Sequence, residues 1–223
     1  MTKTKVTFRV PVPLWDAFST QADGLFLKRA PFLDHVLSRE IPHLEDDLEG
    51  MSLSVRGNRF ISEALHRAQN YQNEKMELKA VNIEIQKTTA DRLNAAVKRH
   101  NLVRDAFFCR LLILFRGQDR MLKRLGVSST TGGMNDYGAP FSTSPMKAME
   151  EVRDDPFFYL RQAILAKHGL GLYLVELPGL MWATCFVDDA MVPTTSKFKK
   201  LKHTMEEFED FLFEVKNDKG SGR

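Results

Sequence analysis

The sequence has few of the residue patterns that mark enzymes or secreted proteins. It contains only two cysteines in 223 residues, Cys109 and Cys185, and each lies alone in an apolar run without a CxxC partner. Such cysteines are typical of buried reduced thiols, so no disulfide framework or zinc site is expected. The six histidines lack HExxH spacing, and no glycine-rich segment ends in the GK[ST] of a phosphate-binding loop. We therefore predict no enzyme activity, no catalytic residue, no metal and no cofactor.

Long apolar runs are also missing. The longest, over 170–187, is interrupted by Glu176, Pro178 and Gly179, which favours a buried hairpin over a membrane span. The first ten residues, MTKTKVTFRV, lack the apolar core of a signal peptide. We therefore expect a cytoplasmic protein with no membrane partner. The content of 43% hydrophobic residues, including 16 Phe, is sufficient for a folded core.

Charge is unevenly distributed along the chain. The net charge is +3, but residues 1–126 hold 21 Lys and Arg against 15 Asp and Glu, whereas residues 127–223 hold 11 against 14. The basic excess therefore lies in the N-terminal part, and it suits a polyanionic partner there.

The N-terminal part contains an internal repeat. Residues 6–41 and 81–116 align without a gap at a constant offset of 75. The identical pairs are Val6/Val81, Asp16/Asp91, Leu27/Leu102, Arg29/Arg104, Phe32/Phe107 and Leu37/Leu112. Further positions are apolar in both copies, among them Phe8/Ile83, Val10/Ile85, Phe18/Leu93 and Val36/Leu111. Two segments that repeat one burial pattern are expected to repeat one structural unit.

Each copy opens with a predicted strand. Residues 5–10 and 80–85 alternate apolar and polar side chains, so one face of each strand is expected in a core and the other in solvent. Pro11 and Pro13 end the first strand, because proline has no N–H for a ladder.

Two predicted helices follow each strand. The first runs over about 14–23 and 89–100, and the second begins near Pro31 or Asp105, residues that favour a helix start. One strand and two short helices cannot bury this much apolar surface alone. We therefore expect the two units to pair within the chain.

The order of strand, helix, turn and helix resembles the ribbon-helix-helix (MetJ/Arc-like) DNA-binding superfamily of bacteria and phages. Arg9-Val10-Pro11 and the turn residue Arg29 carry the resemblance in the first unit, and Arg104 carries it in the second. Glu84 and Gln86 depart from the Arg and Pro of that pattern. The resemblance covers about 80 residues and implies an antiparallel ribbon that enters the major groove of double-stranded DNA. Tandem units in one chain resemble the conjugation accessory proteins of some plasmids.

Alternation places five polar side chains on the strand face opposite the core, and these are the predicted base-reading residues: Lys5, Thr7, Arg9, Asn82 and Glu84. Arg can bind guanine, Asn can bind adenine, Glu can accept from cytosine, and the Thr methyl can contact thymine. If Thr7 stands opposite Asn82, then Lys5 stands opposite Glu84 and Arg9 opposite Ala80. An ordinary solvated sheet face is the alternative.

Phosphate contacts are predicted near the starts of the second helices, from Lys28, Arg29 and Arg104. A solvated turn residue is the alternative for Arg29 and for Arg104. Such contacts would supply affinity and register but no sequence information.

The predicted fold class is mainly α with short β. A tandem ribbon-helix-helix domain spans 1–126, with units at about 5–44 and 80–117 and a connector at 45–79 that holds a helix over roughly 59–75. A linker over 127–145 follows, then a small α+β module over 146–217 and a disordered tail over 218–223. The module is predicted to hold a helix from Asp155-Pro156 to about Lys167, a hairpin of strands over 171–177 and 180–187, and a final helix from Ser196.

The predicted function is a double-stranded DNA-binding protein of bacterial, phage or plasmid origin, associated with the nucleoid. Transcriptional regulation and a role in DNA transfer or segregation both remain open. The alternative is a protein-interaction module, antitoxin-like or anchoring, whose C-terminal module binds a protein partner or mediates self-association. An unrecognised active site in that module is a further alternative.

Overall fold

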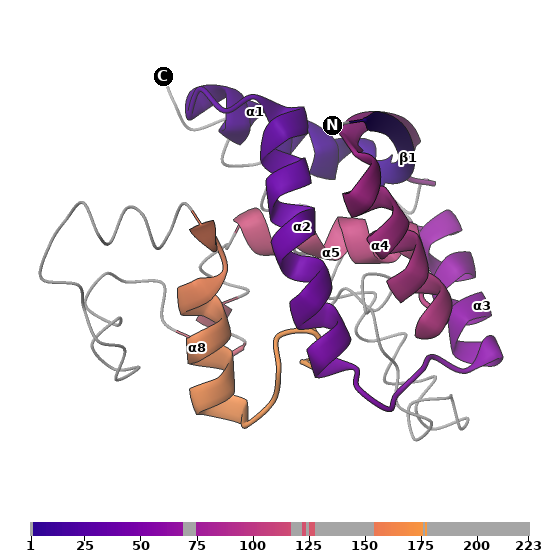
Figure 1. Cartoon of the computed structure of the whole chain (residues 1–223), viewed down its shortest axis with the longest axis vertical. Helices are drawn as coiled ribbons and strands as arrows, with labels where there is room; N and C mark the ends of the chain where they lie inside the picture. Colours follow the sequence, from indigo (N-terminus) through magenta and orange to yellow (C-terminus); the bar gives the residue numbers. More distant parts are fainter. Residues whose placement is uncertain are drawn as a thin grey trace, which may run out of the picture.

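In a computed structural model of the chain, the described residues are 2–68, 75–116, 122–123, 125–127, 154–175 and 177. Their elements, in chain order, are β1 (Lys3–Pro11), α1 (Val12–Gly24), α2 (Arg29–Asp47), α3 (Val55–His66), β2 (Leu78–Gln86), α4 (Lys87–Arg99), α5 (Arg104–Arg116) and α8 (Phe158–His168). Figure 1 shows that these residues are mainly helical. The strands β1 and β2 form a two-stranded sheet. The predicted class, mainly α with short β, is confirmed.

The offset of 75 recurs in the secondary structure. The strands β1 and β2, the helices α1 and α4, and the first residues of α2 and α5 all lie 75 positions apart. The turns between the helices also match, because Phe26 and Asn101 both have a left-handed backbone, with φ of 56° and 51°. Residues with positive φ other than glycine are uncommon, so the same unusual turn in both units supports one repeated local structure.

The two strands pair antiparallel within the chain. Thr7 stands opposite Asn82, Lys5 opposite Glu84 and Arg9 opposite Ala80, which is the expected register. The inward side chains of the ribbon are buried, and they are Val6, Phe8, Val10, Val81, Ile83 and Ile85. Alternation therefore separates an apolar face from a polar face on both strands, as predicted.

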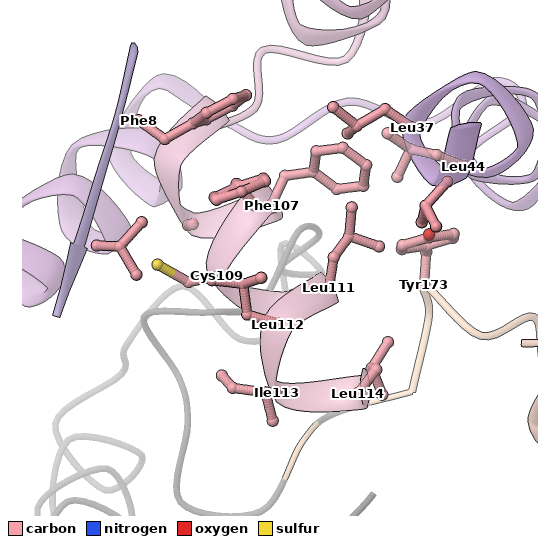
Figure 2. Packing of buried hydrophobic residues seen from close by; sticks show 14 of the residues in the cluster. Phe8, Leu37, Leu44, Phe107, Cys109, Leu111, Leu112, Ile113, Leu114 and Tyr173 are labelled. Carbon is pink, nitrogen blue, oxygen red and sulfur yellow. The ribbon is translucent and has the colours of Figure 1, made fainter. Parts of the chain in front are cut away.

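The helices of the two units interlock beneath this ribbon. Helix α2 packs against β2 and α4 of the other unit, and α5 packs against β1 and α1. At the centre, the rings of Phe8 and Phe108 stack with centroids 4.0 Å apart. Figure 2 shows α5 running through this core, with Phe8 on one side and Leu37 and Leu44 on the other. Each unit therefore completes the core of its partner.

The connector helix α3 begins at Val55, earlier than the predicted start near residue 59. The Ser54 hydroxyl explains the earlier start, because it accepts a hydrogen bond from the Gly57 N–H at 2.9 Å and caps the helix. The helix ends at His66 rather than near residue 75, and residues 69–74 lie outside those described.

A helix predicted to start at Asp155-Pro156 and to reach about Lys167 is present as α8. The strand predicted over 171–177 is wrong for the described residues, because 172–174 form a turn. Side chains of α2 and α5 form hydrogen bonds with the backbone of this turn. The Tyr173 N–H donates to Asp47 Oδ2 at 2.8 Å, and Arg110 donates to the carbonyls of Leu172 and Val175. Residues 128–145 of the linker predicted over 127–145 lie outside the described residues, and so do the second strand, the last helix and the tail.

Residues 154–175 and Leu177 pack onto the tandem units. The fully buried Glu40 of α2 accepts hydrogen bonds from Arg161 of α8 and from the Tyr173 hydroxyl. The ring of Tyr173 lies 5.8 Å from that of Phe107, near Leu44 in Figure 2. The domain boundary near residue 126 stays a prediction, but this later segment supplies partners to buried polar groups of α2 and α5.

Candidate nucleic-acid interface

The outer face of the ribbon carries all five predicted base-reading residues. Lys5, Thr7 and Arg9 come from β1, Asn82 and Glu84 come from β2, and every one of them is exposed. They share one face because the inward positions alternate with them along both strands. The pairing register brings side chains 75 residues apart in the sequence into adjacent positions.

The centre of this face is the pair of Thr7 and Asn82. The Thr7 hydroxyl donates a hydrogen bond to Asn82 Oδ1 at 2.7 Å. This bond orients the exposed Asn82 side chain, whose amide has two N–H donors besides the bonded oxygen. A fixed amide on a rigid strand pair suits hydrogen bonding to a base edge.

The two halves of the face differ in charge. Lys5 stands opposite Glu84, and within the described residues no ion pair joins them. Arg9 stands opposite Ala80, whose methyl group offers it no polar partner. The guanidinium of Arg9 therefore lies on the face with a small apolar neighbour.

Arg104 was predicted to contact phosphate, and in the structure its side chain is bonded to the ribbon. Its Nη2 donates to the Thr7 carbonyl at 3.0 Å, and its guanidinium lies 5.6 Å from the centre of the Phe8 ring. The side chain thus ties the start of α5 to the middle of β1. A half-buried residue in this position supports the ribbon from the side.

Asp105, the next residue, lies close to Arg9. Burial raises the pKa of the Asp105 carboxyl, although a hydrogen bond from the Arg9 backbone N–H and the charges of Arg104, Arg9 and His66 act in the opposite direction. The start of α5 therefore places a carboxyl beside the ribbon end that carries Arg9. The equivalent position in α2 is Ala30.

Arg29 and Lys28 occupy the start of α2. Arg29 Nη1 donates to Ser19 Oγ at 3.1 Å, and its Nε lies 3.7 Å from Asp23 Oδ1. Its side chain is 44% exposed, and Lys28 is exposed as well. Unlike Arg104, Arg29 is held by a long surface ion pair, which leaves its guanidinium accessible.

Lys3 was missed by the sequence prediction. Strand β1 begins at Lys3, and the side chains at positions 3, 5, 7 and 9 of a strand point to the same face. The exposed Lys3 therefore lies on the same face as Lys5, Thr7 and Arg9. The signal was the alternation itself, which continues one step before residue 5.

The described part of the chain holds neither a metal site nor a membrane-spanning helix. Among the described residues, no group of three or more His, Cys, Asp or Glu side chains is arranged to hold a metal ion. Within that same part of the chain, no helix combines the length and the apolar character needed to cross a bilayer. Comparison of the chain with models of protein families, with curated proteins and with solved structures gave no match.

Proposed function

We propose that the protein binds double-stranded DNA through a tandem ribbon-helix-helix pseudo-dimer that inserts the β1–β2 ribbon into the major groove. The observation that carries this proposal is the register around Thr7 and Asn82, which gathers five exposed polar side chains on one face. The major groove is wide enough for a two-stranded ribbon, and it presents a different donor and acceptor pattern for each base pair.

The chemistry of the face supports reading of bases. Arg9 can donate two hydrogen bonds to guanine O6 and N7, and Asn82 can pair with adenine N6 and N7. The Thr7 methyl can contact the methyl of thymine, while Glu84 can accept from cytosine N4. Lys5 completes this set with a flexible cation.

Phosphates would be bound beside the ribbon, at the start of α2. Lys28 and Arg29 are exposed there, and backbone N–H groups of a first helical turn favour an anion. Arg104 is already bonded to the Thr7 carbonyl, so it supports binding chiefly by positioning the ribbon. We therefore assign more of the phosphate binding to α2 than to α5.

Such a protein would act as a bacterial, phage or plasmid regulator of transcription, or as an accessory to DNA transfer or segregation, on DNA of the nucleoid. The alternative of a protein-interaction module concerns the C-terminal residues, most of which lie outside those described. No contact among the described residues favours it over DNA binding.

The test is binding of the full chain to labelled duplex DNA, first of random sequence and then of a site selected from a random pool. Binding should weaken by orders of magnitude between about 50 and 200 mM salt if six or more phosphates are contacted. A triple change of Lys5, Thr7 and Arg9 to Ala should abolish preference for the selected site. A folded chain with no affinity for any duplex at low salt would refute the proposal.

A further inference from the structure

The exposed face of α3 is unusually basic. The helix buries Gly57, Ile61 and Leu65. The opposite face, which we name the α3 stripe, consists of Arg56, Arg59, Glu63 and the following Arg67, three cations and one anion. These residues recur at intervals of three or four positions, so they form one continuous row along the helix.

The two later arginines of the stripe share one carboxylate. Arg59 Nε donates to Glu63 Oε1 at 2.9 Å, and Arg67 Nη2 donates to Glu63 Oε2 at 3.2 Å. The side chains of Arg59 and Arg67 are 81% and 76% exposed. Exposed ion pairs of this kind are weak and are screened by salt, so each guanidinium can exchange the carboxylate for another anion.

The Arg67 end of the stripe lies at one particular end of the ribbon. The Ala68 carbonyl, just beyond α3, accepts a hydrogen bond from the Met76 N–H at 2.7 Å. The next residue, Glu77, accepts from the Val12 N–H at 3.0 Å, where β1 has just ended. Because β1 ends and β2 begins at this edge, the end of α3 lies on the Arg9 side of the ribbon.

Among the described residues, no such addition covers the equivalent turn of the first unit. In the second unit the connector covers the turn, since the Leu53 N–H donates to the His100 carbonyl at 2.8 Å and Asn101 Nδ2 donates to the Leu53 carbonyl at 2.8 Å. In the first unit the residue equivalent to Asn101 is Phe26, which is 94% exposed. The basic helix is therefore attached to one side of an otherwise repeated structure.

We propose that Arg56, Arg59 and Arg67 of the α3 stripe bind phosphates of the duplex next to the ribbon, on the Arg9 side only. This inference rests on the proposed function. From Arg56 to Arg67 the rise of a helix gives about 16 Å, which corresponds to roughly five base pairs of duplex. The bound DNA would thus extend further on one side of the ribbon than on the other.

The test compares the full chain with the triple variant Arg56→Gln, Arg59→Gln and Arg67→Gln on a selected duplex. Gln keeps a high helix propensity and removes the charge. The matched control is Arg39→Gln, Lys98→Gln and Lys167→Gln, exposed cations on α2, α4 and α8. In Figure 1, α8 lies on the side of α2 away from α3. Each protein is titrated with the intact duplex and with duplexes trimmed by about five base pairs at one end or the other.

For the wild type we expect trimming at one end alone to weaken binding about tenfold, with no effect of trimming at the other end. The stripe variant should bind the intact duplex about as weakly as wild type binds the trimmed one. Its plot of log affinity against log salt should be shallower by about 2 to 3, since each lost phosphate contact removes about 0.9. The control variant should behave like the wild type.

Equal sensitivity to both ends, or an unchanged salt slope in the stripe variant, would overturn the inference while leaving DNA binding intact. An equal loss in the control variant would overturn it too, because a general charge effect would then explain the result. A wild-type chain that binds no duplex removes the proposed function and this inference together. If the triple variant does not fold, Arg56→Gln alone serves, since Arg56 lies outside the Glu63 ion pairs and should lower the slope by about 0.9.

Discussion

Thr7 and Asn82 stand opposite each other at the centre of the ribbon and are joined by a hydrogen bond of 2.7 Å. They are also equivalent residues of the repeat, because they lie 75 positions apart. On either side of this pair, a residue of β1 does not face its own repeat equivalent. Lys5 faces Glu84, which is the repeat equivalent of Arg9, and Arg9 faces Ala80, which is the repeat equivalent of Lys5. The backbone of the ribbon is therefore two-fold in pattern, whereas its outer chemistry is not.

Unequal effects at Arg9 and Glu84 are the first prediction. Arg9→Ala should cost about 1–3 kcal/mol of binding to a selected duplex and relax preference at one base position. Glu84→Ala should change affinity much less, or strengthen binding, because it removes a negative charge near the phosphates. Titrations of both variants with a selected duplex and with random duplex measure the difference.

The two DNAs also provide the control. Equal losses for Arg9→Ala on selected and random duplex would make Arg9 a phosphate contact rather than a base contact. The selected site itself should be asymmetric. A strongly palindromic site would instead indicate pairing of identical units from two chains.

The ribbon was predictable from sequence because its signals are local and periodic. Alternation defined the two faces, and the gapless repeat made pairing about Thr7 and Asn82 the natural register. The turn at 172–174 was not predictable, since its apolar residues suited a buried strand equally well. Its conformation depends on Asp47 and Arg110, which are far away in the sequence.

The hydrogen bond of Arg104 to the Thr7 carbonyl could not be predicted from the sequence for a related reason. Arg29 and Arg104 are identical positions of the repeat, yet one contacts Ser19 and Asp23 and the other contacts the ribbon. The local sequence predicted a phosphate contact for both arginines. Only the packing of α5 against β1 distinguishes them.

The same pair supplies the second prediction. Arg104→Ala should lower the free energy of unfolding by about 1.5–3 kcal/mol, because it removes a charged hydrogen bond to the Thr7 carbonyl and a contact with the Phe8 ring. Arg29→Ala should cost under about 1 kcal/mol of stability but should reduce the salt slope of DNA binding by about 1. Urea unfolding and salt titrations measure the two quantities. Reversed effects at the two positions would contradict the assignment.

The third prediction concerns the buried carboxylate of Glu40. Burial disfavours a charged Arg161, but the hydrogen bond to Glu40 and the charges of Glu40 and Asp155 outweigh it and keep the pKa of Arg161 raised. Arg161→Met would leave Glu40 buried with the Tyr173 hydroxyl as its remaining donor from this cluster. We expect a loss of about 3–5 kcal/mol in urea unfolding.

Two further variants test whether the loss of stability comes from the Glu40–Arg161 cluster. Arg99→Met removes an ion pair with Glu45 in which the arginine side chain is 65% exposed, and should cost under about 1 kcal/mol. Combining Glu40→Leu with Arg161→Met should recover much of the stability, because an apolar pair avoids the desolvation of both charges. A double variant no more stable than Arg161→Met would show that the cluster is not the cause.

The last prediction follows from the raised pKa of Asp105, which burial causes against the opposing effects of Arg9, Arg104 and His66. At pH values between the ordinary pKa near 4 and the raised pKa, Asp105 holds a proton in the native chain that it has released in the unfolded chain. The free energy of unfolding therefore falls as pH rises through this window, and the penalty is complete above it. Asp105→Asn cannot ionise, so its stability relative to wild type should increase from about pH 4 upward and then become constant. Urea unfolding of both proteins at a series of pH values measures this difference, in which the other carboxyl groups cancel. A relative stability that falls with rising pH would mean that Asp105 is stabilised as a carboxylate by the Arg9 N–H and the nearby cations.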